Sequence, residues 1–268
     1  MKDKILVFIP MYNCEKQIVR VIDQLSGEVG KYLAEAIIVN NRSTDNGEEA
    51  VVEKIKESSF SFPVSVLRNV ENYGLGGSHK VAFEYAIKHD FDYVIVLHGD
   101  DQGSIADLLP ALKSGGYRKY DCCLGARFAP KSRLDGYSKF RIFGNHVFDF
   151  IFTVVMKRKV YDLGAGLNLY RVDMLKDRYF HTYPDNLTFN VYMLMATKAY
   201  EQHYCFFPLS WRETDQVSNA KVMSQAVKTL KMAVGFLIKG KEFLEQDSRE
   251  KKIEQYEYQV VHREEGKQ

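Results

Sequence analysis

The chain has 268 residues and a formal net charge of +2. That length is enough for one large α/β domain with a substantial core, or for two small domains. Hydrophobic residues make up 46% and charged residues 27%, as in ordinary globular proteins. The small net charge does not indicate a nucleic-acid-binding protein, so any basic patch must be local.

The start of the chain and its cysteines indicate the compartment. Residues 1–7 lack the long apolar segment and cleavage site of a signal peptide. No apolar run approaches the ~20 residues that cross a bilayer. The four cysteines fit neither a zinc site nor a disulfide framework in their spacing. We therefore expect reduced thiols in a cytoplasmic protein.

The first half of the chain alternates short apolar runs with amphipathic segments. Strands are predicted at residues 4–9, 36–39, 64–67, 93–97 and 122–125. Helices are predicted between them at residues 15–25, 47–56 and 78–88. This alternation predicts right-handed βαβ units and a mostly parallel sheet with helices on both faces. In such sheets, ligands bind beyond the carboxyl ends of the strands.

The second half is less regular. Residues 140–156 are rich in Phe, Ile and Val and are followed by three basic residues, a pattern that suits insertion at an anionic bilayer surface. Residues 221–241 are basic and amphipathic, which fits a membrane-facing helix or one that packs on the sheet or on a second subunit. The last twenty residues predict a solvated helix or a loose tail. The simplest division is a domain over residues 1–220, then a helical appendage and polar tail over 221–268.

Polar residues follow the first two predicted strands. After the first come Pro10, Tyr12 and Asn13, where a proline and an aromatic ring can form a flat wall for a nucleobase, although a plain turn explains them as well. Asn40 opens a polar segment after the second strand. Its side chains could bind a base or a ribose, but Asn, Ser and Asp also dominate turns and helix caps.

A glycine-rich loop, Asn72-Tyr73-Gly74-Leu75-Gly76-Gly77-Ser78, precedes the third predicted helix. Glycine lets a ligand approach the backbone closely, and a helix N-terminus attracts anions such as a diphosphate. The spacing is not that of the dinucleotide-binding fingerprint, and the loop lies two βα units too late for it. Alone, the loop is weak evidence for a phosphate site.

Clustered acids follow the fourth predicted strand, in Leu97-His98-Gly99-Asp100-Asp101-Gln102. Carboxylate and amide oxygens suit hard divalent cations. Two adjacent acids directly after a buried strand therefore favour a metal or phosphate-ligand site over a polar turn.

The order of these segments resembles a known family. Ile-Pro-x-Tyr-Asn, Ile-Ile-Val-x-x-x-Ser-Thr-Asp, Asn-x-Gly-x-Gly and Leu-x-x-Asp-x-Gln follow one another as in the GT-A-fold family 2 glycosyltransferases. Later segments resemble the dolichyl- or polyprenyl-phosphate sugar synthase branch: Gly125-Ala126-Arg127-Phe128, Arg141-Ile142-Phe143-Gly144-Asn145, Asp162-Leu163-Gly164-Ala165-Gly166 with Arg171, and Ser218-Asn219-Ala220-Lys221 after Arg212. The resemblance covers residues 4–240. It implies a Rossmann-like GT-A fold, a mostly parallel α/β sheet flanked by helices, with a C-terminal helical appendage.

The resemblance also implies a donor site. Pro10 and Tyr12 would border the nucleobase, and UDP is favoured over GDP. Asn40 stands where the family usually has an aspartate that binds the base, and its carbonyl can still accept a base N–H without charge. Other expected substrate contacts are Asn13, Asn72, Gly74, Gly76 and Asp101.

The family's metal motif, Asp-x-Asp-x-Gln, is altered in this chain. It reads His98-Gly99-Asp100-Asp101-Gln102, so Asp100 and Gln102 are the expected ligands of Mg²⁺ or Mn²⁺. His98 replaces the first acid and could bind the metal, support a ligand or merely fill space. A cation there would bridge the donor diphosphate and stabilise the leaving nucleoside diphosphate.

Four cations are expected to act on phosphate groups: Arg127, Arg141, Arg212 and Lys221. Salt bridges at the surface or in the structure are the alternative for each of them. A lipid phosphate acceptor is already anionic at neutral pH and needs no strong base. A sugar hydroxyl acceptor would need one, such as Asp101 or Asp185.

Together these features predict a glycosyltransferase that moves a hexose from a nucleoside diphosphate sugar to polyprenyl phosphate, peripheral at the cytoplasmic face of the membrane. The same fold could instead add a sugar to a saccharide hydroxyl in capsule or cell-wall synthesis. Asn40 and His98 leave a third interpretation, an inactive nucleotide-sugar-binding subunit. The sequence does not indicate which sugar is moved, or whether the protein forms a homo-oligomer or has a membrane partner.

Overall fold

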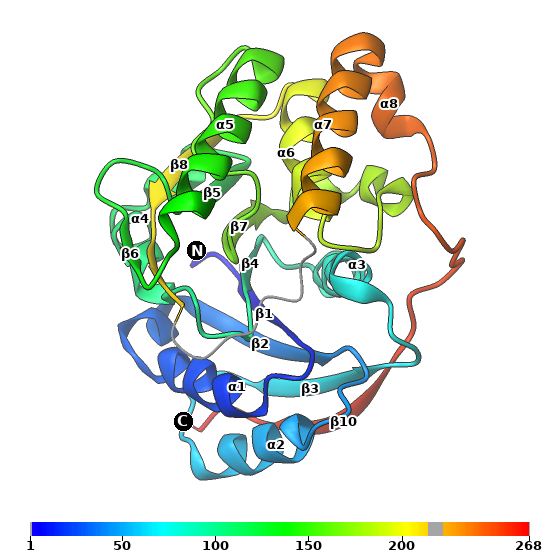
Figure 1. The fold of residues 1–268 in the computed structure, drawn as a ribbon. Coiled ribbons are helices and arrows are strands. Elements are labelled where there is room, and N and C mark those ends of the chain that lie inside the picture. Colours follow the sequence, from blue (N-terminus) through cyan, green and yellow to red (C-terminus); the bar gives the residue numbers. More distant parts are fainter. Residues whose placement is uncertain (1, 214–221, 268) are drawn as a thin grey trace.

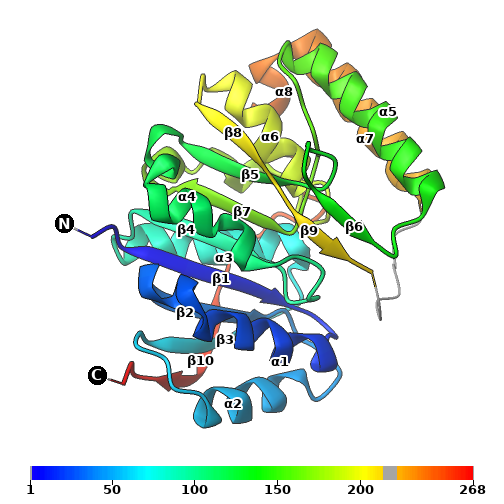
Figure 2. The same cartoon turned by 90° about the vertical axis from the view of Figure 1, so that its left-hand side faces the viewer.

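The structure is a computed structural model that describes residues 2–213 and 222–267. Its centre is an eight-stranded sheet in the order β10-β3-β2-β1-β4-β7-β5-β8, with helices on both faces (Figures 1 and 2). The strands of this sheet are β1 Ile5–Met11, β2 Leu33–Asn40, β3 Val64–Asn69, β4 Tyr93–Leu97, β5 Cys122–Ala126, β7 Leu167–Arg171, β8 Tyr204–Pro208 and β10 Tyr258–Glu264. A separate pair consists of β6 Arg133–Asp135 and β9 Ser210–Arg212.

The α-helices within the described residues follow the same order along the chain. They are α1 Glu15–Asp23, α2 Gly47–Glu57, α3 Gly74–Lys88, α4 Leu109–Ser114, α5 Lys139–Met156, α6 Phe189–Ala199, α7 Val222–Lys239 and α8 Lys241–Glu245. All strands and helices expected in the first half are present, with ends shifted by a few residues. No helix in the described part of the chain combines the length and the apolar character needed to cross a bilayer.

The sheet is mostly parallel, as expected. The antiparallel members are β7, which lies between β4 and β5, and β10, which pairs with β3. Pro10 lies inside β1 instead of ending it. A proline is tolerated there because β4 pairs with β1 only as far as Phe8, so the missing N–H of Pro10 is not needed on that side.

Two hydrophobic clusters cover the two faces of the sheet. Alternate residues of β1 contribute to each, because successive strand side chains point to opposite faces. Leu6 and Phe8 pack on the side of α3 and α6, whereas Val7 and Ile9 pack on the side of α1 and α2. Both faces are therefore buried, and the polar ends of the strands are left to form the site.

The C-terminal part returns to this sheet. After α7 and α8, residues 246–257 run past α3 and lead into β10, drawn in red in Figure 1. The expectation of a solvated helix or loose tail is therefore wrong over Tyr258–Glu264. The β-forming run Tyr-Gln-Val-Val is masked by charged neighbours, which suit an edge strand because they discourage further pairing. The domain boundary expected at residue 220 lies outside the described residues.

Candidate active site

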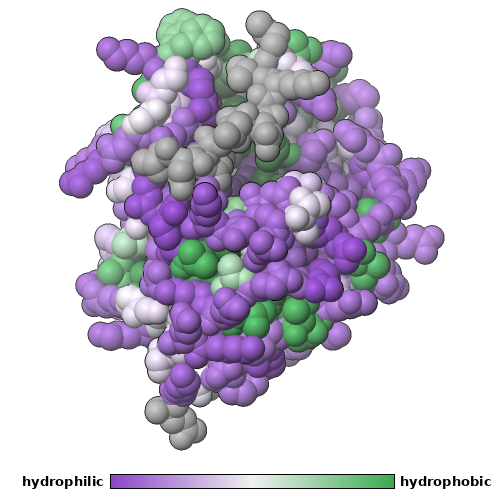
Figure 3. All heavy atoms as spheres, turned by 60° about the horizontal axis from the view of Figure 1, so that its bottom comes forward, coloured by the Kyte–Doolittle hydropathy of each residue, from purple (hydrophilic) through white to green (hydrophobic). Residues whose placement is uncertain are grey.

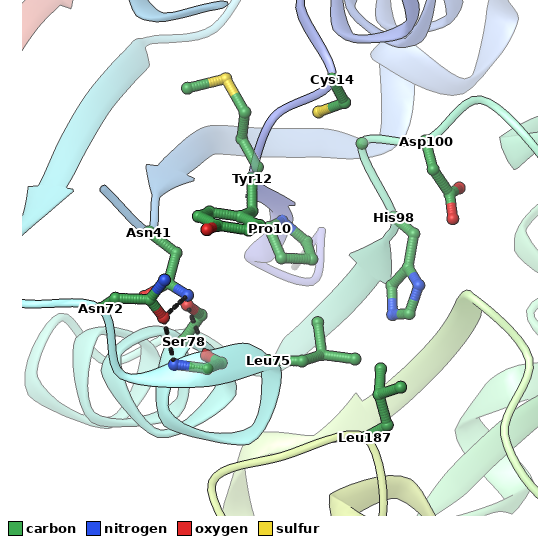
Figure 4. Close-up of a pocket in the computed structure, with 13 residues that line it drawn as sticks. Pro10, Tyr12, Cys14, Asn41, Asn72, Leu75, Ser78, His98, Asp100 and Leu187 are labelled. Carbon is green, nitrogen blue, oxygen red and sulfur yellow. Dashed lines mark hydrogen bonds between the residues drawn. The ribbon is translucent and has the colours of Figure 1, made fainter. Parts of the chain in front are cut away.

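A cleft of about 350 Å³ opens at the carboxyl ends of the central strands. Its wall comes from the end of β1, the residues after β2 and β4, and the start of α3, with Leu187 opposite (Figure 4). This is the position in which parallel α/β sheets bind their ligands. The predicted site residues on its wall are Pro10, Tyr12, Asn72, Gly74, His98 and Asp100.

The two asparagines after β2 have different surroundings. Asn40 is buried, donates to Glu48 Oε2 (2.6 Å) and accepts from the Ser43 backbone N–H (2.8 Å). It lies behind the cleft wall, whereas Asn41 lies on the wall and donates to Asn72 Oδ1 (2.8 Å). Asn41 is therefore a residue of the cleft wall that the sequence motifs did not indicate. Because consecutive side chains leave a strand on opposite sides, only one of the two can face the cleft.

Asn13 also holds the backbone in place. Its φ of 49° is in the left-handed region, which asparagine tolerates better than most residues. The side-chain oxygen of Asn13 accepts from the Thr44 backbone N–H (2.7 Å), and the backbone N–H of Asn13 donates to Ser43 Oγ (3.1 Å). These bonds join the end of β1 to the loop after β2, beside the exposed ring of Tyr12.

The glycine-rich loop packs against another part of the chain. The N–H groups of Gly76 (2.8 Å) and Gly77 (3.4 Å) donate to the carbonyl of Asp185. A Cβ at Gly76 would lie 2.4 Å from the Pro184 carbonyl oxygen, so a side chain does not fit there. The Gly74 N–H donates to Asn72 Oδ1 (2.9 Å). These backbone N–H groups therefore already have acceptors within the protein. They could bind a diphosphate, as expected from the sequence, only if those hydrogen bonds were broken.

The two adjacent acids after β4 point to different places. Asp101 is 3% exposed, has a φ of 57°, and accepts hydrogen bonds from Arg20 (2.6 Å) and Arg212 (2.6 Å). Asp100 faces the cleft instead, and burial raises the pKa of its carboxyl to about 6. The Gln102 backbone N–H donates to Asp100 Oδ1 (3.3 Å). Asp101 thus serves as an anchor in this structure, and Asp100 is the acid on the cleft wall.

His98 stands beside Asp100 on the cleft wall (Figure 4). Burial lowers the pKa of its imidazole to about 4, so the ring is neutral at physiological pH. Its Nε2 is shielded from solvent and has no hydrogen-bond partner among the described residues. A Cβ at Gly166 would come within 2.8 Å of the ring, so this glycine makes room for His98.

These residues fit a divalent cation only in part. In the described ranges, no group of three or more His, Cys, Asp or Glu side chains is arranged to hold a metal ion. The carboxylate of Asp100 suits a Mg²⁺ or Mn²⁺ ion whose remaining ligands are phosphate oxygens and water, whereas the Nε2 of His98 is shielded from solvent. A cation at this cleft would therefore depend on the bound diphosphate for several of its ligands.

The predicted phosphate-binding arginines are all in ion pairs. Arg127 makes a bidentate pair with buried Asp162 (2.7 Å to each oxygen), Arg141 pairs with Glu213 (2.6 Å), and Arg212 pairs with Asp101. The salt-bridge alternative thus describes these three arginines in this structure. Lys221 lies outside the described residues.

The fold and the cleft define the class of protein: a mostly parallel α/β protein with a polar cleft at the strand ends, which is the architecture of the GT-A glycosyltransferases. The family model of glycosyl transferase family 2 matches residues 6–179. The chain belongs to glycosyl transferase family 2 and is a glycosyltransferase.

The chain is also similar to one curated protein and to solved structures. Uncharacterized protein MJ1222 from Methanocaldococcus jannaschii is 26% identical over 175 residues, which are 65% of this chain and 68% of that protein. S. aureus TarS, solved alone and with UDP or UDP-GlcNAc, is similar in fold, with a TM-score of 0.57 and 19% identity for the structure without ligand. That match covers 88% of this chain but only 66% of the TarS chain.

A second solved structure with a similar fold is glucosyl-3-phosphoglycerate synthase from Mycobacterium tuberculosis, solved with Mn²⁺, UDP and phosphoglyceric acid. Its TM-score is 0.58 at 13% identity, over 91% of this chain and 79% of that one. At such identities the likeness shows the fold alone.

Proposed function

We propose that the chain transfers a hexose from a UDP-sugar to polyprenyl phosphate at the cytoplasmic face of a membrane. On the donor side, the ring of Tyr12 and the amides of Asn41 and Asn72 offer a wall for the nucleoside. Structures of similar fold hold UDP or a UDP-sugar, which supports UDP as the nucleotide. The cleft itself supports the donor part of the proposal.

Asp100 would hold Mg²⁺ or Mn²⁺, helped by His98 and Gln102. The cation would neutralise charge on the leaving diphosphate. Within this chain, Asp100 supplies an anionic oxygen at the cleft, and neutral His98 supplies a nitrogen lone pair without adding positive charge. Nothing in this arrangement requires a protonated histidine.

The state of the two candidate bases favours a phosphate acceptor. Asp101 is held by two arginines, and Asp185 accepts a hydrogen bond from Lys80 (2.7 Å). A carboxylate held by cations is a poor base, because the ion pair must be broken before it can accept a proton. A sugar hydroxyl would need such a base, whereas a lipid phosphate supplies an oxygen that is already anionic.

The observation that carries the membrane part of the proposal is an exposed apolar surface on two neighbouring helices, here named the α5–α7 face. The helices pack side by side, away from α1 and α2 (Figure 2). The exposed apolar side chains of the face are Phe140, Phe143, Val147, Phe150 and Val154 on α5 and Val227, Leu230, Val234, Leu237 and Ile238 on α7. Monomeric proteins rarely expose so many large apolar residues together.

The charges around the α5–α7 face favour anionic lipid. Exposed Lys228, Lys231 and Lys239 lie on α7, which contains no acidic residue. The single acid of α5, Asp149, is buried. A second copy of this face would bring like charges together, whereas anionic headgroups would meet opposite charge. By contrast, the side of the molecule with α1 and α2 is largely hydrophilic (Figure 3).

The proposal is tested by supplying the protein with a UDP-sugar and Mn²⁺, and with undecaprenyl phosphate in vesicles of phosphatidylglycerol and phosphatidylcholine. We expect a glycosylated lipid phosphate as the product. Product formed only with lipid-linked saccharides would instead establish transfer to a hydroxyl. If UDP binds but the donor is neither transferred nor hydrolysed with any acceptor, the chain is a binding subunit.

A further inference from the structure

Residues 182–188, the segment before α6, accept hydrogen bonds from the glycine-rich loop through the Asp185 carbonyl. A buried lysine holds this segment in place. Lys80 lies in α3 and is 0% exposed. Its ammonium group donates to the Tyr183 carbonyl (2.6 Å), to Asp185 Oδ1 (2.7 Å) and to the Tyr256 hydroxyl (3.0 Å). A fourth acceptor, the His181 carbonyl, lies at 3.2 Å, so all three protons of the ammonium group have acceptors within reach. Lys80 thus joins α3 to the segment before α6 and to a residue near the C-terminus.

Residues 246–257, here called the strap, reach this lysine from outside. The Tyr256 hydroxyl donates to Asp185 Oδ1 (2.8 Å), and its ring packs edge-on against Tyr73 at a centroid distance of 5.2 Å. The Ser248 backbone N–H donates to the Thr182 carbonyl (2.8 Å). Figure 1 shows the strap running beside α3 on its way to β10. The strap therefore contacts the segment before α6 at both of its ends.

That segment forms part of the cleft. The Asp185 carbonyl accepts from Gly76 at the start of α3, and Leu187, two residues further on, lies on the cleft wall with 54% exposure. The backbone of Gly76 packs directly against the backbone of residues 184–185, with no gap between them. A displacement of Asp185 would therefore move both the glycine-rich loop and Leu187.

Burying the charged ammonium group of Lys80 costs free energy unless its N–H groups all have hydrogen-bond acceptors. Burial lowers the pKa of Lys80 to about 8, although the neighbouring Asp185 opposes that shift. A buried ammonium is tolerated only with good partners, so each of its hydrogen bonds restrains the position of the group that accepts it.

We propose that Lys80 and Tyr256 are positioning residues, through which the strap sets the distance between the glycine-rich loop and Leu187 and thereby the affinity for the nucleotide donor. The inference rests on the proposed function in taking the cleft as the donor site. The strap is not proposed to contact the donor. Its effect passes through Asp185.

The experiment compares Tyr256→Phe with Tyr258→Phe. The first change removes the hydroxyl that bonds Asp185 and Lys80. The second removes a hydroxyl from the same C-terminal region, for which no hydrogen bond is found among the described residues. UDP binding with Mn²⁺ is measured by calorimetry, and the KM for the UDP-sugar is measured well below the unfolding temperature.

We expect Tyr256→Phe to raise both the Kd for UDP and the KM about five-fold, the factor that corresponds to about 1 kcal/mol, with little change in kcat. Tyr258→Phe should leave both constants unchanged. Lys80→Met should act in the same direction as Tyr256→Phe and more strongly. Equal constants for Tyr256→Phe and the unsubstituted protein would overturn the inference.

A measurement without nucleotide separates this inference from the proposed function. Backbone amide exchange of Gly76 and Gly77 should be faster in Tyr256→Phe than in Tyr258→Phe, because their acceptor at Asp185 is less restrained. Equal exchange in the two variants overturns the strap's positioning role. If the unsubstituted protein binds no UDP while the exchange difference is present, the proposed donor site fails and the restraint on Asp185 stands.

Discussion

The cleft and the α5–α7 face differ in how they are built. The cleft is polar and formed by residues that directly follow strands, so its position is set by the sheet. The α5–α7 face is apolar and joins two helices separated by more than sixty residues along the chain. In the cleft, Asn41 and Asn72 are hydrogen-bonded to each other, whereas the apolar side chains of the face are 43–77% exposed. The cleft is preorganised, whereas the α5–α7 face leaves apolar side chains open to a binding partner.

The largest expected effect separates the two regions. Asp100→Ala removes the carboxylate on the cleft wall, so transferase activity with Mn²⁺ should fall at least about 100-fold, because the diphosphate would lose the cation proposed at this carboxylate. Binding to phosphatidylglycerol vesicles should be unchanged. Activity within about three-fold of the original would show that Asp100 does not hold the metal.

The α5–α7 face should respond in the opposite way. Phe143→Ser combined with Phe150→Ser removes two rings that are 68% and 69% exposed in the protein. Burying the exposed part of each ring in lipid contributes roughly 1–2 kcal/mol, so vesicle binding in a sedimentation assay should weaken at least about 30-fold. UDP binding should be unaffected. Val70→Ser combined with Val260→Ser, two exposed valines away from the face, is the matched control. Equal binding by both double variants would contradict a membrane-facing role.

Substitutions of the two adjacent acids test whether Asp101 stabilises the fold while Asp100 serves the cleft. Asp101→Asn leaves Arg20 and Arg212 without their shared anion, so unfolding should become easier by about 1–2 kcal/mol, a fall in Tm of roughly 3–6 °C. Asp100→Asn, one residue away, should lower Tm much less because its carboxylate has no arginine partner in the described structure. Thermal denaturation of the two variants gives the answer, and equal Tm changes would contradict it.

The smallest effect concerns the buried side of α5. Burial, with repulsion from Asp162, raises the pKa of Asp149 to about 8. The folded state then keeps a proton that the unfolded state releases, so the stability of the protein falls as pH rises from about 4 to about 8. Asp149→Asn removes the ionisation, but asparagine is still a buried polar side chain, so we expect it to recover only part of this loss: Tm should rise by about 3 °C at pH 8, roughly 1 kcal/mol, and by less at pH 5. The same change in Tm at both values would show that Asp149 is ionised in the fold.

Sequence patterns identified the frame of the molecule and several residues of the cleft wall. The alternation of buried strands and amphipathic helices predicted the parallel part of the sheet, and the strand ends led to Pro10, Tyr12 and Asp100. β10 was missed because an edge strand with a solvated outer face lacks a continuous apolar run.

The sequence predicted where polar residues lie better than it predicted which residues they bind. Sequence motifs suggested that Arg127, Arg141 and Arg212 bind phosphate, but each meets a carboxylate from a distant part of the chain. Likewise, Asn40 and Asn41 cannot be told apart by residue type, since the strand's alternation decides which of them faces the cleft. Such pairings depend on long-range contacts that a local pattern does not contain.

The antiparallel pairing of β10 with β3 has a consequence for synthesis. Val64 pairs with Glu264, so the outer edge of β3 stays open until nearly all of the described chain has left the ribosome. Contacts of such long sequence separation form late in folding. The nascent N-terminal half therefore carries an unprotected strand edge for most of translation, which is the kind of surface that chaperones shield from other chains.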